Sequence, residues 1–145
     1  MAVIITLGTN ASASPLSQIG TVLRNGPFAF RVDGVRCDVH HVGTSLLGKW
    51  ATGQYCVVRI TYENVTKSPA FAPGYYTAKD IHGDTYVADD IADIYANVGT
   101  NTTMEINPNY GSAFKVYFDI PKNDRLTEFI FDSQYGNKGT VVQLN

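Results

Sequence analysis

The sequence has 145 residues, a length that fits one domain with a sizeable hydrophobic core. Its formal net charge of -2 at pH 7 gives no basic footprint for nucleic acid, and no apolar run is long enough to span a bilayer. Charged residues make up only 17% of the chain, whereas tyrosine (9) and phenylalanine (7) are plentiful, and this balance favours an all-β domain.

The first 18 residues differ in composition from the remainder. Residues 2–7 are apolar, and residues 10–17 are small and polar, as in a flexible lead-in. The tripeptide at 11–13, Ala-Ser-Ala, resembles a signal-peptidase site, although no basic segment precedes it. Residues 1–18 therefore form an N-terminal extension that is a signal-peptide remnant, a tether or a strand. We expect residues 19–145 to form the folded domain.

Residues 19–39 predict two strands joined by the turn pair Asn25-Gly26. Apolar residues alternate on even positions over 28–32 and on odd positions over 35–39. Gly34 stands at this phase switch and predicts a β-bulge. Residues 40–52 are expected to be a long connection that carries Trp50, the only tryptophan.

The clearest strand runs from Gly53 to Asn64, and it is expected to be the central strand of the domain. It is β-branched and aromatic, with no proline. One face carries the apolar residues Cys56, Val58, Ile60 and Tyr62. The other face carries Tyr55, Arg59, Thr61 and Glu63, with Val57 as an apolar exception.

The second half of the chain predicts further short strands. They cover residues 75–81, 85–88, 102–106, 112–120, 126–131 and 139–144, with one helical turn at 89–95 whose aspartates cap its N-terminus. This pattern predicts an antiparallel β-sandwich. We expect its core to place Val58, Ile60 and Tyr62 on one sheet and Phe114, Val116 and Phe118 on the facing sheet.

Several motifs, in their order and spacing, resemble a known family. They are Gly53–Val58 leading to Glu63-Asn64, the hairpin Asp80–Tyr86, Ile106-Asn107-Pro108, and Phe114–Pro121. Together they resemble a bacterial family of domains of unknown function, related to the small secreted mycobacterial antigens called immunoprotective extracellular proteins. The resemblance implies an immunoglobulin-like β-sandwich that is exported or tethered to the cell surface. It brings no catalytic residues.

The two cysteines, Cys37 and Cys56, lie on predicted strands joined by a single connection. In antiparallel register they would face each other on the core side, within bridging distance. Two buried free thiols are the alternative. The export that the resemblance implies favours the disulfide.

Metal and catalytic patterns are weak. His40 and His41 are adjacent on a predicted strand and would point to opposite faces, and His82 lies in a separate turn. The aspartates of residues 80–93 lack EF-hand spacing, and turns and helix caps account for them. No nucleophile, phosphate-loop or dinucleotide motif is present. We therefore expect no enzyme activity, no cofactor and no metal site.

Aromatic residues near predicted loops are the remaining candidates for a binding surface: Trp50, Tyr75, Tyr76, Tyr95 and Tyr110. The alternative is that they cover the open ends of the sandwich. The function expected is an extracytoplasmic, non-enzymatic binding or adhesion module of a bacterium, with a protein or cell-envelope ligand. The alternatives are a structural or assembly domain, a secreted metal-binding accessory domain, or an enzyme with an unrecognised site.

Overall fold

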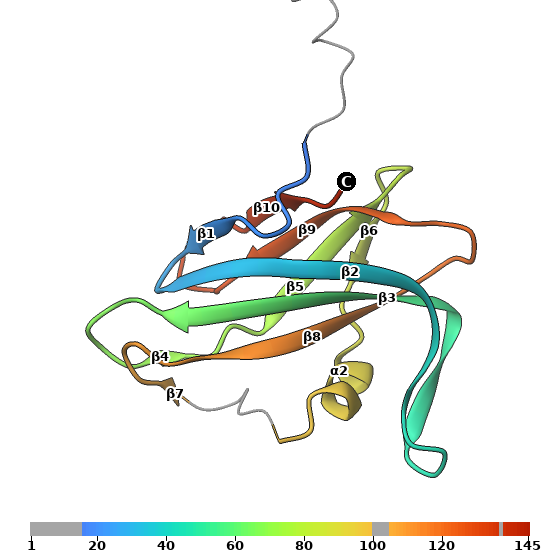
Figure 1. Cartoon of the computed structure of the whole chain (residues 1–145), viewed down its shortest axis with the longest axis horizontal. Coiled ribbons are helices and arrows are strands. Elements are labelled where there is room, and N and C mark those ends of the chain that lie inside the picture. The colour runs from blue at the N-terminus through green and yellow to red at the C-terminus, as the bar shows by residue number, and fades with distance from the viewer. Residues whose placement is uncertain (1–15, 100–104, 137) are drawn as a thin grey trace, which may run out of the picture.

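The computed structural model describes residues 16–99, 105–136 and 138–145, and it consists of two antiparallel sheets packed face to face (Figure 1). The first sheet has the order β1 (Val22–Asn25), β2 (Phe28–Gly43), β3 (Gly48–Asn64), β8 (Gly111–Ile120). The second has the order β10 (Thr140–Gln143), β9 (Leu126–Asp132), β5 (Tyr75–Asp80), β6 (Thr85–Val87). This is the immunoglobulin-like antiparallel β-sandwich that the sequence predicts.

Two smaller elements complete the fold. β4 (Ala70–Phe71) pairs with β7 (Glu105–Ile106) at one end of the sandwich (Figure 1). The helix α2 (Asp90–Ala96) begins after Asp89, whose side chain accepts a hydrogen bond from the backbone N–H of Ala92. The helical turn predicted at 89–95 is thus confirmed, with an aspartate N-cap. Of the strand predicted at 102–106, residues 102–104 lie outside the described residues.

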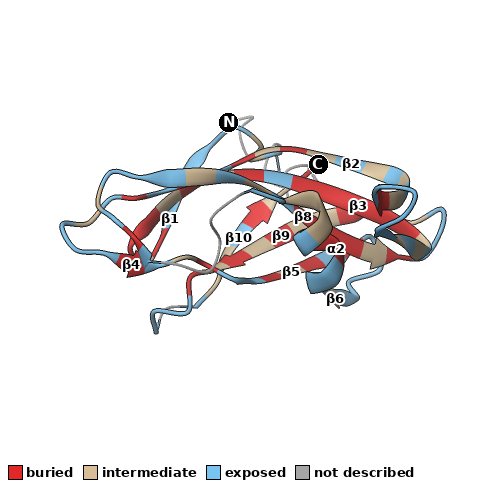
Figure 2. Ribbon diagram, turned by 90° about the horizontal axis from the view of Figure 1, so that it is seen from below, coloured by how far each residue is buried: buried red, intermediate tan, exposed pale blue. Residues whose placement is uncertain are grey.

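The main core fills the space between the two sheets, whose facing sides are buried along their length (Figure 2). Its largest fully buried side chains include Phe28, Phe30, Phe118, Phe129 and Phe131. Phe30 and Phe131 stack across the sheets with ring centroids 4.0 Å apart, and Phe118 meets Phe129 edge to face at 6.2 Å. Aromatic area on facing strands therefore supplies most of the contact between the sheets.

The predicted core residues are buried, or half-buried in the case of Phe114, but they do not lie on facing sheets. β3 and β8 are hydrogen-bonded neighbours in one sheet, with Val58 opposite Val116 and Ile60 opposite Phe114. The facing sheet is supplied by β5, β9 and β10 instead. Alternation shows which face of each strand is apolar. It does not show whether two strands are neighbours in one sheet or lie in facing sheets, because the pattern is the same in both cases.

β2 carries the irregularities of the first sheet. Its pairing with β3 shifts register between Val32 and Gly34, which confirms the predicted bulge. A second shift lies between Arg36 and Val39, where Asp38 has a φ of 62°. At the first bulge, glycine leaves room for a neighbour, because a Cβ at position 34 would displace the guanidinium of Arg59.

The connection expected at residues 40–52 is a strand pair instead. β2 and β3 remain paired as far as Gly43 and Gly48, with His41 opposite Trp50. This projecting hairpin, residues 38–54, bends away from the sandwich beside α2 (Figure 1), and we call it the arm. The sequence pattern does not distinguish this segment from a loop, but its two strands satisfy their backbone groups by pairing with each other.

The Cys37–Cys56 disulfide is confirmed. Cys37 lies in the second irregular stretch of β2, and its Cα is 3.9 Å from the Cα of Cys56 on β3. Neither cysteine is free. The bridge stands where the arm joins the sandwich, and it links neighbouring strands of one sheet.

The N-terminal extension is described only from residue 16. Gln18 pairs with Gln143, both by its backbone N–H and by its side-chain oxygen. Residues 1–15, which include the Ala-Ser-Ala tripeptide, lie outside the described residues. Within the described part of the chain, no helix combines the length and the apolar character needed to cross a membrane.

We predict that Phe118→Ala lowers the free energy of unfolding by about 3–5 kcal/mol, because it removes a fully buried ring and leaves a cavity. Chemical denaturation would measure it. Phe71→Ala is the matched control, because the ring of Phe71 is largely exposed and its removal should cost less than about 1 kcal/mol. Equal losses in both variants would contradict the core described above.

We also predict that the purified protein presents no reactive thiol until it is reduced, and two thiols afterwards. Intact mass after thiol labelling would show this. Reduction should lower stability by about 3 kcal/mol, because the bridge closes a loop with a sequence separation of 19 residues. Labelling of both cysteines in the unreduced, air-exposed protein would refute the bridge.

Candidate binding surface

α2 packs on the outer face of the first sheet and creates a second, smaller core there. Ala92 of the helix covers Val57 and Tyr55 of β3, together with Val42 and Tyr117. Tyr55 and Tyr117 meet edge to face with ring centroids 5.2 Å apart. This cluster explains why Val57 interrupts the polar face of the central strand. The strand is buried on both faces over this stretch.

Asp89 joins the helix to the arm. Its carboxylate caps the helix through the N–H of Ala92 at 3.1 Å and accepts a hydrogen bond from Lys49 Nζ of the arm at 2.7 Å. The hydroxyl of Tyr55 lies 3.4 Å away. Burial raises the pKa of Asp89, but the hydrogen bonds from Lys49 and Ala92 outweigh it and lower the pKa below the ordinary value. The arm and the helix are therefore held in one arrangement.

α2 packs Ala92 and the half-buried Tyr95 and Ala96 against the sheet, but it also leaves two bulky apolar side chains on its outer face. It buries Ala92 and Asp93, whereas Ile91 and Ile94 face solvent, with Ile94 70% exposed. The arm shows the same property, since Leu46 is 92% exposed and Trp50 is 72% exposed. We call this set of exposed apolar side chains, with Leu47, the arm–helix surface; within it, Trp50 lies on the face of the arm that points away from α2, because its neighbours Lys49 and Ala51 face the helix and the smaller core.

α2 also buries the carboxyl of Asp93, which has an electrostatic cost. Burial raises its pKa to about 8, and the charges of Asp90 and Asp89 act in the same direction. The backbone N–H of Tyr117 donates to Asp93 Oδ1 at 2.7 Å and opposes the shift without cancelling it. Asp93 therefore keeps its proton near neutral pH.

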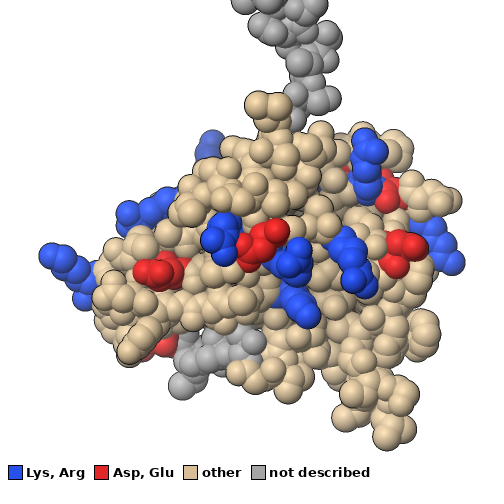
Figure 3. Space-filling model, viewed as in Figure 1, with Lys and Arg blue, Asp and Glu red and all other residues tan. Residues whose placement is uncertain are grey.

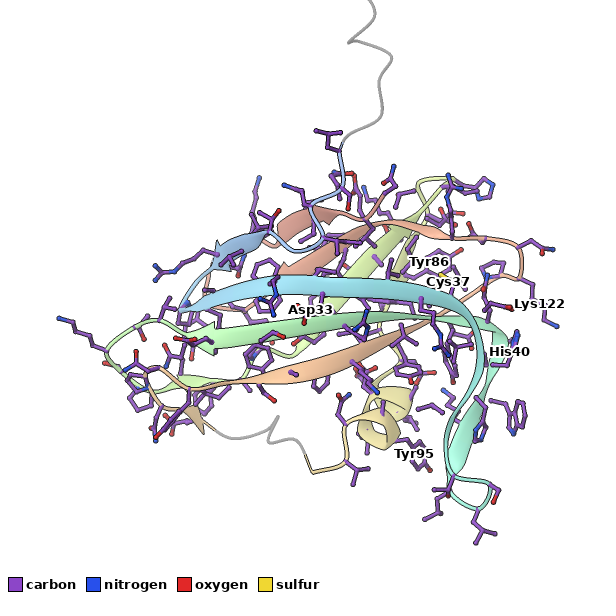
Figure 4. All side chains as sticks on the ribbon, viewed as in Figure 1. Asp33, Cys37, His40, Tyr86, Tyr95 and Lys122 are labelled. Atoms are coloured by element: carbon purple, nitrogen blue, oxygen red, sulfur yellow. A yellow bond between two sulfur atoms is a disulfide. The ribbon has the colours of Figure 1, made fainter. Side chains whose placement is uncertain are left out.

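The aromatic residues predicted as binding candidates fall into different environments. Tyr76 is only 3% exposed and packs in the main core against Phe129, so its side chain is not at the surface. Tyr95 is half-buried on α2 and packs against the smaller core (Figure 4). Trp50, Tyr75 and Tyr110 are exposed. The expectation for Tyr76 is therefore wrong.

The exposed three do not form one patch. The carbonyl of Tyr110 accepts a hydrogen bond from Asn64, which ends β3, whereas Trp50 lies near the start of the same strand. The strand rises about 3.3 Å per residue, so the two positions are roughly 40 Å apart along it. Tyr75 begins β5, which runs beside β9. Trp50 and Tyr110 therefore lie toward opposite ends of β3, and Tyr75 lies on the other sheet.

The turn between β5 and β6 holds a compact polar cluster. Asp80, His82 and Asp84 each offer a possible metal-ligand atom, and these atoms lie within 4.8 Å of one another. Asp80 Oδ1, however, accepts hydrogen bonds from the backbone N–H groups of His82 and Asp84, both at 2.9 Å, and Oδ2 accepts one from the Tyr86 hydroxyl at 3.1 Å. These hydrogen bonds give Asp80 a structural role, because they stabilise the turn.

Asp124, from the turn before β9, influences the titration of Asp80. Burial raises the pKa of Asp80, but the interactions with Asp124, Asp84, His82 and Tyr86 lower it to about 2. Burial and the neighbouring Asp80 raise the pKa of Asp124. The two carboxyl groups therefore shift each other's pKa in opposite directions.

The other histidines are separated from this cluster. His40 Nε2 lies 2.9 Å from Asp38 Oδ1 on the exposed edge of the arm (Figure 4), and His41 contacts the Trp50 ring with centroids 4.5 Å apart. The arm thus places the two adjacent histidines with different partners, as strand alternation predicts.

The sequence over residues 17–141 matches the model of a family described as a domain of unknown function, DUF4352. The chain belongs to this family. No curated protein matches this chain. The family assignment agrees with the resemblance seen in the motifs of the sequence.

Solved structures share the fold of this DUF4352 domain. The yjhA protein from Bacillus subtilis has a TM-score of 0.63 at 12% identity, over 90% of this chain and 100% of that one. MPT63, a secreted protein from Mycobacterium tuberculosis, has a TM-score of 0.58 at 17% identity, over 91% and 99%. An uncharacterised β-sandwich protein from Clostridium difficile has a TM-score of 0.53 at 12% identity, over 92% and 98%.

Sequence reasoning missed the arm–helix surface, although two signals pointed to it. Val57 on the polar face of β3 indicated a second covering element. Ile91 and Ile94 in a short, aspartate-rich helix indicated that the apolar side chains and Asp93 compete for the sheet. The structure shows that Asp93 faces the sheet and that Ile91 and Ile94 face solvent, which the sequence pattern alone does not decide.

We predict that Asp93→Asn stabilises the protein at neutral and mildly alkaline pH. Because the folded pKa is about 8, well above the ordinary 3.8, folding favours the protonated acid. This contribution is fully present below about pH 4 and is lost as the pH rises through about 8. An amide does not titrate, so the variant should exceed the wild type by about 1–4 kcal/mol at pH 8.

Thermal or chemical unfolding from pH 4 to pH 8 would measure this difference. The difference between variant and wild type isolates Asp93 from Asp89 and Asp80, whose lowered pKa values act in the opposite direction. Glu63→Gln, which removes an exposed carboxyl of β3 that is not among the causes of the Asp93 shift, is the matched control and should show no such trend. Parallel stability profiles for Asp93→Asn and wild type would overturn the assignment.

Proposed function

We propose that this DUF4352 domain is an extracytoplasmic, non-enzymatic binding module that contacts a protein partner through the arm–helix surface. The observation that carries the proposal is the exposure of bulky apolar side chains on α2. The helix exposes Ile91 and Ile94 and buries Asp93, at a cost in protonation free energy that an ordinary amphipathic helix would avoid. Local features that cost stability are concentrated at functional sites.

The composition of the arm–helix surface supports a protein as the ligand. Interface cores are depleted of charge and enriched in aromatic residues, and anchors such as tryptophan supply much of the binding energy. Trp50, Leu46 and Ile94 are of this kind, and Lys49 of the arm is already engaged by Asp89. The anchored arm also needs little ordering on binding, which favours affinity.

An extracellular or cell-surface location in a bacterium is part of the proposal. The disulfide supports it, because such bonds persist in oxidising compartments. One of the structures with the same fold is a secreted protein. Both observations are compatible with a domain that meets its partner outside the cytoplasm.

The test measures binding of the fluorescently labelled domain to cell envelope isolated from the producing organism. The combined variant Leu46→Ser, Trp50→Ala, Ile94→Ser should lose at least about tenfold in affinity, because several hot-spot side chains are removed. Its melting temperature should be nearly unchanged, because these side chains are exposed. Emission from Trp50, the only tryptophan, should shift to shorter wavelength on binding.

Val22→Ser with Val141→Ser is the matched control, because it removes exposed apolar side chains from β1 and β10, on the other side of the sandwich (Figure 1). Proteolysis of the envelope beforehand should abolish binding if the partner is a protein. Sedimentation of the domain alone tests self-association. Undiminished binding of the arm–helix variant, or binding that survives proteolysis, would refute the proposal.

A further inference from the structure

A second feature of the outer face is a concentration of positive charge beside α2. Figure 3 shows Lys and Arg side chains gathered over the strands of the first sheet. A pocket of about 150 Å³ lies there, lined by Arg36, Arg59 and Lys115 together with Val39, Val57 and Tyr117. The cations are exposed, whereas Val57 and Tyr117 are buried, so the pocket has an apolar floor and a cationic rim.

Strand register brings these residues together. Gly34 on β2, Arg59 on β3 and Lys115 on β8 form one row across the sheet, and Arg36, Val57 and Tyr117 form the next row on the same face. Gly34 permits the guanidinium of Arg59 to lie against the backbone of the bulge. The bulge thus helps to fix the position of this cation at the pocket.

The three cations lack the partners that would explain their position. Among residues 16–99, 105–136 and 138–145, no carboxylate lies within 4.0 Å of Arg36, Arg59 or Lys115, and their side chains form no hydrogen bond. Arg59 and Lys115 stand directly opposite each other. Like charges at directly opposite positions of a sheet are destabilising.

The nearby carboxylate does not neutralise them. Asp33, on the same face (Figure 4), accepts a hydrogen bond from the Thr61 hydroxyl at 2.6 Å and pairs with Arg31 at 2.5 Å. Burial raises the pKa of Asp33, but these hydrogen bonds and the charges of Arg31 and Arg59 lower it. Asp33 is thus committed to Arg31, and the pocket keeps a net positive charge.

We propose that this pocket binds a phosphate or sulfate group. Two guanidinium groups and an ammonium around a concave site provide the directed donors and the charge that such oxyanions require. The bound anion would also offset the repulsion between Arg59 and Lys115. The phosphate or sulfate group could belong to a free ion or to an organic monoester. The apolar floor of the pocket suits the organic part of a monoester. The proposal is independent of the arm–helix surface.

The test uses calorimetric titration with inorganic phosphate, sulfate and phenyl phosphate at constant ionic strength, with chloride as the reference anion. Wild type should bind all three oxyanions and be stabilised by them against heat. Arg59→Gln and Lys115→Gln should each weaken binding about tenfold, the typical effect of losing a hydrogen bond to a charged group. Neither variant should be less stable than wild type without ligand, because each relieves repulsion.

Two further variants separate site binding from general charge effects. Lys122→Gln removes an exposed cation from the turn between β8 and β9 and should leave binding unchanged (Figure 4). Gly34→Ala keeps every charge but displaces the Arg59 guanidinium, so it should weaken binding. If phenyl phosphate binds more tightly than inorganic phosphate, the proposed site is supported and its ligand is a phosphate monoester. If inorganic phosphate binds more tightly, the site is supported and its ligand is the free ion. Equal affinities in wild type, Arg59→Gln and Lys115→Gln would overturn the proposal.

Discussion

The burial of β3 on both faces is the constraint on which the rest of the structure depends. Its even-numbered residues, from Cys56 to Tyr62, enter the core between the sheets, while Tyr55 and Val57 enter the smaller core under α2. A shift of one residue against β2 or β8 would exchange the two sets. The register of the first sheet is therefore fixed from two sides, and so are the positions of the arm, the helix and the row of cations.

The two layers that cover β3 differ in size, and this difference determines what the outer face of the first sheet exposes. The second sheet covers one side of β3 with large aromatic rings, whereas α2 covers the other with Ala92 and Asp93. Ala92 brings the helix close to the sheet and Tyr95 packs half-buried against the same core, whereas Ile91 and Ile94 are left outside. The uncovered part of the same face carries Arg59 and Lys115. An apolar surface and a cationic pocket thus arise side by side from one short helix that covers only part of a sheet.

Alternation, turn pairs and caps were enough to predict the sandwich, the bulge at Gly34, the cap of the helix and the facing positions of the cysteines, whereas the choice of a disulfide over free thiols drew on the family resemblance. Each of these depends on neighbours along the chain or on one hairpin. The arrangement of strands between sheets depends on longer-range contacts, which is why β3 and β8 were expected to face each other. Tyr75 and Tyr76 show the same limit, because adjacent residues at a strand start point to opposite sides, and only the pairing of β5 with β9 decides which enters the core.

The position of the disulfide has a mechanical consequence for the arm. The hydrogen bonds between the two strands of the arm are loaded one after another when its tip is pulled away, as in the opening of a zipper. This opening reaches Cys37 and Cys56 before it reaches the paired residues of the sandwich. At that point the tension passes to a covalent bond. The arm can therefore be stretched open under force while the β2–β3 pairing inside the sandwich stays intact.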